Sequence, residues 1–191
     1  MKKATLGIAI SLLLALLASL GLIGIETDSE TDATTRLSQT EETHAKSTYN
    51  DNARWHGWSD HDPQVNLTHI FLGEINRRGK PTGFHSRPGG LDPENARLER
   101  IKSPPNHVGV YTAQIAVYDP DQQRWKQKFS SFFPDSMDHE NVINSILHAW
   151  KNRESGRNAP WRGPSGHGFM IEGYLSRRGG INTAYPIYQR R

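Results

Sequence analysis

The sequence of 191 residues contains no cysteine. This absence excludes a disulfide framework, a thiol nucleophile and a lipid-anchoring cysteine. A domain without disulfides must depend on its own hydrophobic core for stability. The length suffices for one domain with an appendage but not for two full domains.

Long apolar runs are also scarce, because hydrophobic residues make up only 35% of the chain and one segment holds much of that share. This segment, residues 4–25, directly follows Lys2 and Lys3. A short basic start before an apolar run is typical of a secretory signal peptide or a membrane anchor, and the length of the run leaves both alternatives open. We therefore expect residues 1–25 to send the chain to the periplasm or the medium, or to anchor it in a membrane through residues 4–25 if they are not cleaved.

Apolar periodicity is missing from residues 26–51, which are rich in Thr, Ser, Asp and Glu. Such a composition predicts a disordered linker. The linker is acidic, with seven Asp or Glu residues against Arg36 and Lys46. Residues 52–191 consequently hold 19 Lys and Arg against 13 Asp and Glu, a net charge of +6 compared with +3 for the whole chain. A domain with this balance is suited to a polyanionic partner such as nucleic acid.

The middle of the domain predicts two antiparallel strands. Residues 108–118 alternate with the period of a strand, and residues 125–133 return after a turn at 119–122. The apolar face of the first strand consists of Tyr111, Ala113, Ile115 and Val117. Before this pair, residues 87–107 predict a long loop, because they open on Arg-Pro-Gly-Gly and contain a Pro-Pro pair.

The C-terminal part predicts a helix followed by a hairpin. Asp138 is suited to cap a helix with one apolar stripe. The stripe consists of Val142, Ile143, Ile146, Leu147 and Trp150. Residues 169–175 and 182–188 predict the final hairpin, across a turn at 176–180. Residues 52–191 are therefore expected to form an α+β domain of antiparallel β-sheets with flanking helices.

Nine histidines invite a search for catalysis. His69 begins an apolar segment and His85 follows a turn-rich stretch, so the two lie on the arms of a predicted hairpin that can bring them together. Two imidazoles that face one cavity can cleave a ribose phosphodiester, because one accepts the proton of the 2′-hydroxyl while the other protonates the leaving 5′-oxygen. An unperturbed imidazole titrates near ~6.5, so a neutral and a charged histidine can coexist near neutrality.

Charge that develops on the phosphate calls for a nearby cation. Lys126 and Lys128 alternate along the second predicted strand and therefore point to the same face. The spacing of these histidines and lysines is suggestive of a ribonuclease site but not specific for one.

Four motifs, however, resemble those of EndoU-type endoribonucleases. The segment HIFLGEI at 69–75, with the following GK at 79–80 and GFH at 83–85, resembles the paired-histidine segment of that family. The segment KQKFSSFFP at 126–134 resembles the family's lysine segment and the Ser-x-Phe-Phe-Pro run of its bacterial toxin members. The segment TAYP at 183–186 resembles its closing Thr-Ala-Tyr motif. The resemblance covers about residues 65–188, with the motifs in the family's order.

The resemblance implies roles for individual residues. His69 and His85 would form the acid–base pair. Lys126 would be the cation that faces the phosphate, because it lies four residues before Ser130, as the family's lysine lies before its serine. Lys128 is the second candidate for that role. The substrate-binding residues that the resemblance implies are Lys128, Ser130, Thr183 and Tyr185.

The resemblance also implies a substrate and a fold. EndoU-type enzymes generally leave a 2′,3′-cyclic phosphate, many favour uridine, and their fold is a pair of antiparallel sheets flanked by helices. Animal members carry a glutamate immediately before the first histidine, in a region associated with manganese dependence, whereas this chain has Thr68. We therefore expect cleavage of single-stranded RNA without a metal or other cofactor. Because bacterial members are usually the tips of larger toxins, an immunity protein is a candidate partner.

Three alternatives belong to other classes. An exported module that binds RNA or another polyanion without cutting it would account for the charge equally well. A metal-dependent nuclease would use the histidines and aspartates of residues 56–62, since imidazole and carboxylate groups are common metal ligands. The loop at 162–168 contains Ser165 between glycines but does not match the serine-hydrolase motif, and no strand is predicted before it. That loop, with Arg162, is expected to edge the substrate cleft instead.

Overall fold

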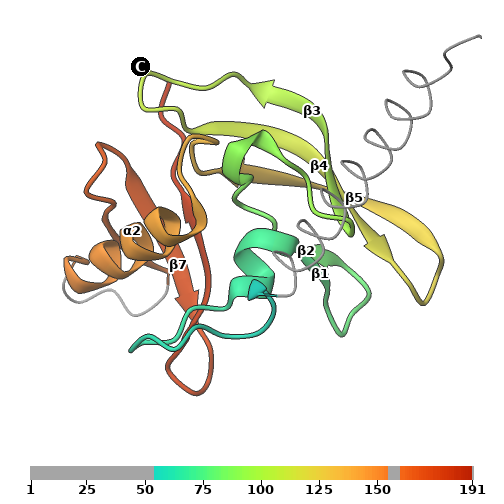
Figure 1. Cartoon of the computed structure of the whole chain (residues 1–191), viewed down its shortest axis with the longest axis horizontal. Coiled ribbons are helices and arrows are strands. Elements are labelled where there is room, and N and C mark those ends of the chain that lie inside the picture. Colours follow the sequence, from blue (N-terminus) through green and yellow to red (C-terminus); the bar gives the residue numbers. More distant parts are fainter. Residues whose placement is uncertain (1–53, 155–159, 191) are drawn as a thin grey trace, which may run out of the picture. The chain divides into compact units, whose positions relative to one another are not determined.

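The computed structural model describes residues 54–154 and 160–190 (Figure 1). The predictions for residues 1–25 and 26–51 therefore lie outside the described residues, as do Asn52 and Ala53 of the expected domain. Within the described ranges, no helix is long and apolar enough to cross a membrane.

One sheet consists of three antiparallel strands in the order β3–β4–β5 (Figure 1). Their bounds are Ala96–Ser103, Tyr111–Asp119 and Arg124–Phe132. The two strands expected at 108–118 and 125–133 are confirmed, whereas the expected loop at 87–107 is wrong because it contains β3. β3 is an edge strand in which only Ala96 is buried, so it lacks the apolar alternation that would have revealed it.

The predicted apolar face of β4 is buried. Tyr111, Ala113, Ile115 and Val117 form a hydrophobic core with Phe84, Ala96 and Phe132. The opposite face of the sheet carries exposed aromatic side chains, among them Trp125 and Phe129. Because side chains alternate along a strand, Lys126, Lys128 and Ser130 of β5 lie on the same side as the core face.

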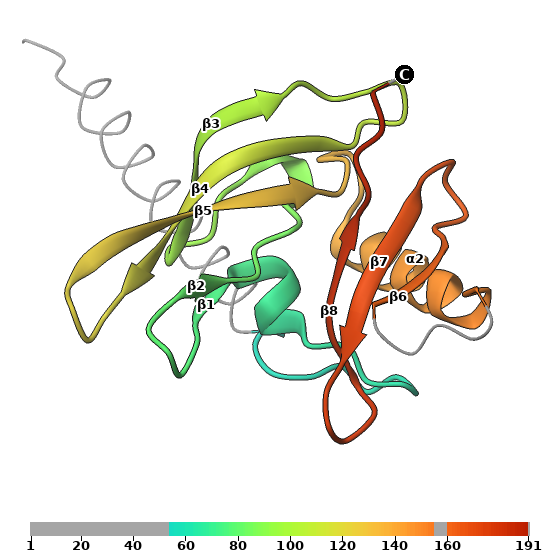
Figure 2. The ribbon, with the colours of Figure 1, turned by 180° about the vertical axis from the view of Figure 1, so that it is seen from behind.

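A second sheet, in the order β6–β7–β8, packs against the main helix. The strands are Trp161–Pro164, Met170–Leu175 and Ile181–Pro186, and the helix α2 is His139–Lys151. The helix and the final hairpin are confirmed: the Asp138 side chain accepts a hydrogen bond of 2.7 Å from the backbone N–H of Asn141, and Val142, Ile143 and Ile146 are buried. Figure 2 shows α2 on one face of this sheet.

The strand β6 was not expected, because its four residues include Gly163 and Pro164, which are typical of loops. Packing explains the glycine: a Cβ atom at position 163 would lie 1.9 Å from the carbonyl oxygen of Ala149 in α2. The helix therefore approaches the strand so closely that only glycine fits there. The expectation that no strand precedes Ser165 is wrong.

A two-stranded hairpin and two short helical turns complete the described domain. The hairpin pairs β1, Glu74–Ile75, with β2, Pro81–Thr82. It follows a π-helical turn, η1, at Thr68–Leu72, and precedes a 3₁₀ turn, η2, at Pro88–Gly90. The architecture is thus α+β with three small antiparallel sheets and one main helix, where the sequence predicted paired sheets with flanking helices.

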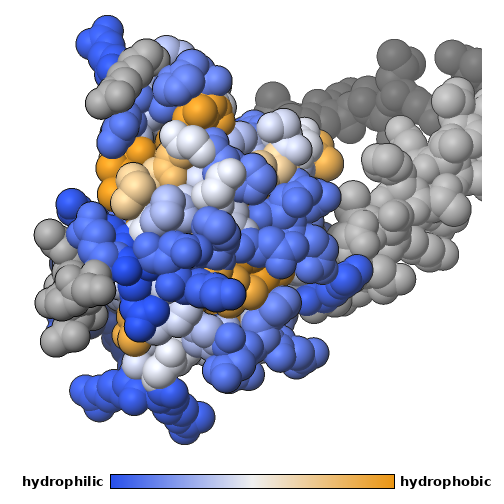
Figure 3. Space-filling model, turned by 90° about the vertical axis from the view of Figure 1, so that its left-hand side faces the viewer, coloured by the Kyte–Doolittle hydropathy of each residue, from blue (hydrophilic) through white to orange (hydrophobic). Residues whose placement is uncertain are grey.

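The two larger sheets meet where β5 lies beside β8 (Figure 2). The Ser131 hydroxyl of β5 donates a hydrogen bond to the carbonyl oxygen of Pro186 at the end of β8. Beyond β8, the Tyr188 hydroxyl donates to the carbonyl oxygen of Pro104, and the side-chain amide of Asn106 donates to the carbonyl oxygen of Gln189. The C-terminal segment therefore crosses from the second sheet to the loop between β3 and β4. Figure 3 shows a surface on one side of the domain that is mostly hydrophilic, with apolar side chains in separate small patches.

Candidate active site

The backbone brings the two predicted histidines together. His69 lies in η1 and His85 follows β2. The N–H groups of Phe84 and His85 donate hydrogen bonds of 2.8 Å to the carbonyl oxygens of His69 and Ile70. Gly83 makes this approach sterically feasible, since a Cβ atom there would lie 2.2 Å from the His69 carbonyl oxygen. The centroids of the two imidazole rings are 5.9 Å apart.

His69 is buried and oriented by two neighbours. Its Nδ1 lies 2.9 Å from a carboxylate oxygen of Glu74, and its backbone N–H donates to the side-chain oxygen of Asn66. A carboxylate only accepts hydrogen bonds, so Nδ1 of His69 carries its proton towards Glu74. Glu74 thereby fixes the ring and offers a counter-charge to an imidazolium.

His85 is buried as well and is held through the same ring atom. Its Nδ1 donates to the carbonyl oxygen of Ser131 at 3.0 Å and also lies 3.0 Å from the Ser130 hydroxyl. Burial, reinforced by the nearby positive charges of Lys128 and His69, holds the pKa of His85 well below its ordinary value. His85 is therefore neutral near pH 7, with its proton on Nδ1.

The second ring nitrogen of each histidine is available for chemistry. In the described part of the chain, neither Nε2 atom has a hydrogen-bond partner. In the neutral tautomer that the Ser131 carbonyl selects, Nε2 of His85 is a proton acceptor. Nε2 of a protonated His69 is a proton donor. The pair can therefore supply one base, and one acid whenever the His69 ring carries both of its protons.

Of the two lysines, the structure brings Lys128 to the histidines. Its ammonium donates to the carbonyl oxygen of Gly83 at 2.7 Å and to the hydroxyl of Ser130 at 3.3 Å. The Ser130 hydroxyl in turn donates to the Phe84 carbonyl oxygen and borders Nδ1 of His85. Burial lowers the pKa of Lys128 to about 8, so the ammonium form still predominates at pH 7.

Lys126, which the resemblance implied as the cation at the phosphate, has a different environment. Its ammonium forms a 2.6 Å ion pair with the buried Asp119 and donates to the carbonyl oxygen of Gly79 at 2.7 Å. It thereby ties the end of β4 to the turn between β1 and β2. The geometry therefore favours Lys128 over Lys126 as the cation beside the histidines.

Tyr185 and Thr183 lie on β8, and Tyr185 is close to His85. The ring centroids of Tyr185 and His85 are 5.3 Å apart. The Tyr185 hydroxyl donates to the carboxylate of Glu172, which also pairs with Arg162 at 2.6 Å. Thr183 is two residues before Tyr185 and therefore lies on the same face of the strand.

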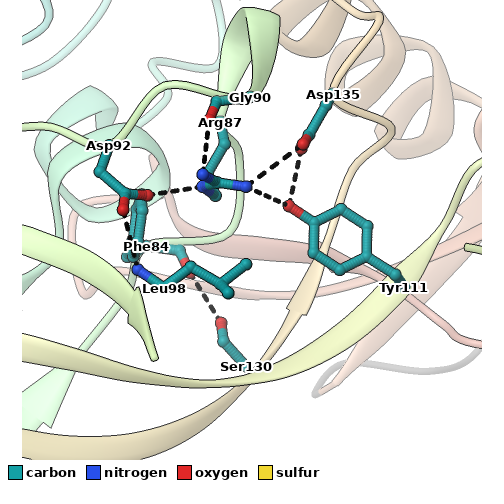
Figure 4. Close-up of polar contacts among 8 residues, drawn as sticks. All are labelled: Phe84, Arg87, Gly90, Asp92, Leu98, Tyr111, Ser130 and Asp135. Atoms are coloured by element: carbon teal, nitrogen blue, oxygen red, sulfur yellow. Dashed lines mark hydrogen bonds and ion pairs between the residues drawn. The ribbon is translucent and has the colours of Figure 1, made fainter. Parts of the chain in front are cut away.

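A cluster of polar contacts around Arg87 supports the loop that follows His85 (Figure 4). Arg87 is paired with Asp92 at 2.6 Å and with Asp135 at 3.2 Å. The Tyr111 hydroxyl donates to Asp135 at 2.6 Å and also lies near the guanidinium of Arg87. This cluster ties the loop after His85 to β4 and to the segment after β5.

Sequence reasoning did not identify Glu74, Ser131, Glu172 and Asn66 as contributors to the site. Only Glu74 had a signal in the sequence, because it lies five residues after His69 within the segment that resembles the family. Ser131 acts on His85 through its backbone carbonyl, which every residue possesses, so no side-chain pattern could reveal it. The role of Glu172 depends on the pairing of β7 with β8.

The other proposed sites have no such geometry. Within the described ranges, which include residues 56–62, no group of three or more His, Cys, Asp or Glu side chains is arranged to hold a metal ion. Ser165 is buried, and its hydroxyl accepts hydrogen bonds from the N–H groups of His167 and Phe169. It forms a turn and is not an exposed nucleophile.

Comparison with known proteins agrees with the resemblance. The family model described as "Bacterial EndoU nuclease" matches residues 63–188, which include all four motifs. A Bacillus cereus protein described as a toxin is 28% identical over 125 residues, which cover 63% of this chain and 22% of the relative. The matched region therefore spans about a fifth of that toxin's length. No solved structure matches the chain.

Proposed function

The chain belongs to the bacterial EndoU nuclease family, and from this membership we propose that it is an endoribonuclease that cuts single-stranded RNA. The observation that carries the proposal is the pair of buried imidazoles, 5.9 Å apart, whose Nε2 atoms have no partner among the described residues. The different environments of the two rings suit them to opposite roles in proton transfer.

In the proposed reaction, Nε2 of His85 accepts the proton of a ribose 2′-hydroxyl. The 2′-oxygen attacks the adjacent phosphorus, and the bond from phosphorus to the 5′-oxygen breaks. Protonated His69, with Glu74 as its counter-charge, donates the proton of Nε2 to that 5′-oxygen. The products are a 2′,3′-cyclic phosphate and a free 5′-hydroxyl.

The cation and the substrate contacts complete the proposal. The ammonium of Lys128 stabilises the negative charge that develops on the phosphate, and Ser130 holds the ammonium beside His85. Tyr185 and Thr183 contact the nucleotide at the cleavage site, with uridine as the expected base. Thr68 replaces the glutamate associated with manganese dependence in animal members, and its hydroxyl accepts a hydrogen bond from the Gly57 N–H. We therefore expect the reaction to need no metal.

The biological setting is proposed on different grounds. The similarity to a toxin supports a role in poisoning cells and an immunity protein that blocks the site. The apolar segment at 4–25 supports export, followed either by release or by retention at a membrane through the linker at 26–51. Recovery of the intact N-terminus in a membrane fraction would support retention, and a soluble product that starts after this segment would support release.

The test of the chemistry is cleavage of a defined single-stranded RNA in the presence of a chelator, with identification of the product ends. We expect a 2′,3′-cyclic phosphate and a 5′-hydroxyl. The matched control carries a single 2′-methoxy group at the scissile position and should remain intact while still binding. Cleavage of this control at the normal rate would refute attack by the 2′-hydroxyl. Binding of RNA without any cleavage would favour the non-catalytic alternative.

A further inference from the structure

A groove of about 440 Å³ lies beside the histidine pair, where the outer face of the first sheet meets β8 and the C-terminal segment. Phe129 of β5 lines it together with Tyr185 of β8 and Tyr188 of the C-terminal segment. Its volume is in the range of sites that take a small organic group. The acid–base pair does not use this space.

The groove is continuous with the candidate active site. Tyr185 lines the groove and also faces the His85 ring, with 5.3 Å between the centroids. Ser131 lines it too, while its carbonyl oxygen accepts the hydrogen bond from Nδ1 of His85. A chain that places a phosphate between the histidines therefore has its neighbouring nucleotide within reach of the groove.

The lining suits a nucleotide of single-stranded RNA. Phe129 is 59% exposed, an unusual degree for a phenylalanine, and its ring is open to stacking. Lys102 is an exposed cation at the groove. The carboxylate of Glu172 is neutralised by Arg162 and hydrogen-bonded by Tyr185, so it does not oppose a phosphate as a free anion would.

We propose that this groove binds the nucleotide next to the scissile linkage, with its base stacked on Phe129 and its phosphate near Lys102. The inference rests on the proposed function, because it assumes an RNA chain at the histidines. It goes further by assigning a second contact region outside the acid–base centre.

The test pairs a protein variant with a change in the RNA. Trinucleotides are prepared in which the base on either flank of the scissile linkage is replaced by an abasic ribonucleotide. For the wild-type protein, loss of one flanking base should lower kcat/KM by about fivefold to 100-fold, the range expected for one base–aromatic stack. In Phe129→Ala the intact trinucleotide should be cut correspondingly less well, and removal of the same base should have little further effect. This loss of sensitivity is the signature of a direct contact.

Trp125→Ala is the matched control, because Trp125 is an exposed aromatic residue on the same face of β5 but outside the groove. This variant should keep the wild-type sensitivity to the abasic substitution. Equal weakening by both variants would show that the exposed face in general, and not the groove, binds RNA, and would overturn the proposal. Full sensitivity to base removal in a folded Phe129→Ala protein would overturn it as well.

A binding arm separates this inference from the proposed function. Trinucleotides with 2′-deoxyribose at the scissile position cannot react, so fluorescence anisotropy reports their affinity without catalysis. If the wild-type protein cuts no RNA, the proposed function fails even where the Phe129 contact is seen in binding. The protein could instead cut RNA while Phe129→Ala responds to removal of a flanking base as the wild-type protein does, in both binding and cleavage. In that case the groove proposal alone fails.

Discussion

At the scale of single residues, replacement of either histidine tests the acid–base pair. Proton transfer by a positioned side chain contributes about 10²-fold to 10⁴-fold to a rate, so His69→Ala and His85→Ala should each lose about that much in kcat. Residues that act as a unit are not additive, and the double variant should lose less than the product of the two effects. Single-turnover cleavage with a folding check by circular dichroism measures this. Wild-type cleavage by both folded single variants would refute the mechanism.

Replacement of the two lysines should have different effects, on catalysis for Lys128 and on stability for Lys126. Lys128→Ala should lower kcat more than it weakens RNA binding, because its charge acts mainly on the transition state. Lys126→Ala should instead lower the melting temperature by roughly 5 °C or more, since it leaves the Asp119 carboxylate without its counter-charge. Kinetics and thermal unfolding of both variants separate the two roles. A stable Lys126→Ala protein with a lower kcat than Lys128→Ala would instead support Lys126 as the cation at the phosphate, as the resemblance implies.

The pH dependence should reflect the two shifted groups. The pKa of His85 is lowered well below its ordinary value, so this base stays unprotonated and active into mildly acidic solution. The pKa of Lys128 is lowered to about 8, so its charge is present below that pH and is lost above it. Activity should therefore fall as the pH rises through about 8. In Lys128→Arg the residual activity should persist to higher pH, and an unmoved alkaline limb would assign that limb to another group.

At the scale of elements, the site depends on one backbone contact between η1 and the segment after β2. Gly83 has φ of +73°, and a Cβ atom there would lie 2.2 Å from the carbonyl oxygen of His69. Phe84 also adopts a positive φ, of 58°, while its ring is fully buried. Two successive left-handed residues thus turn the chain so that His85 faces His69.

Gly83→Ala should accordingly cost both stability and activity. The steric conflict with the His69 backbone adds to the roughly 1 to 2 kcal/mol that a left-handed conformation costs an alanine. Gly179→Ala is the control, because Gly179 has φ of +87° and nothing lies within 4 Å of the place that its Cβ atom would take. This control should show the conformational cost alone and retain cleavage. Comparable unfolding temperatures and rates for the two variants would contradict the importance of the contact.

At the scale of the whole molecule, the charge of residues 52–191 should govern encounter with RNA. These residues carry a net charge of +6. Binding of a non-cleavable single strand should therefore weaken as salt increases, with a slope of about −0.7 per phosphate contacted in a plot of log K against log salt. Fluorescence anisotropy at several salt concentrations measures the slope. An affinity that does not depend on salt would show that the excess of basic residues does not contribute to binding.

Much of the framework could be predicted from local patterns. The alternation in β4, the cap at Asp138, the apolar stripe of α2 and the final hairpin all have periodic or capping signals, and the structure contains each of them. The strands β3 and β6 could not be predicted, because β3 is a polar edge strand and β6 is a short strand with Gly163 and Pro164. Their pairing comes from neighbouring strands and not from their own composition.

The sequence by itself determined the family, and it predicted the histidine pair to which we assign the acid–base chemistry, because both depend on residue types in a recognisable order. Only the tertiary structure decided which lysine accompanies them. Lys126 and Lys128 share a face of β5 and have equal intrinsic chemistry, but Asp119 engages the first while Gly83 and Ser130 hold the second beside His85. The tautomer of His85 was likewise decided by the Ser131 carbonyl, a backbone group that becomes specific only when the fold places it against the ring.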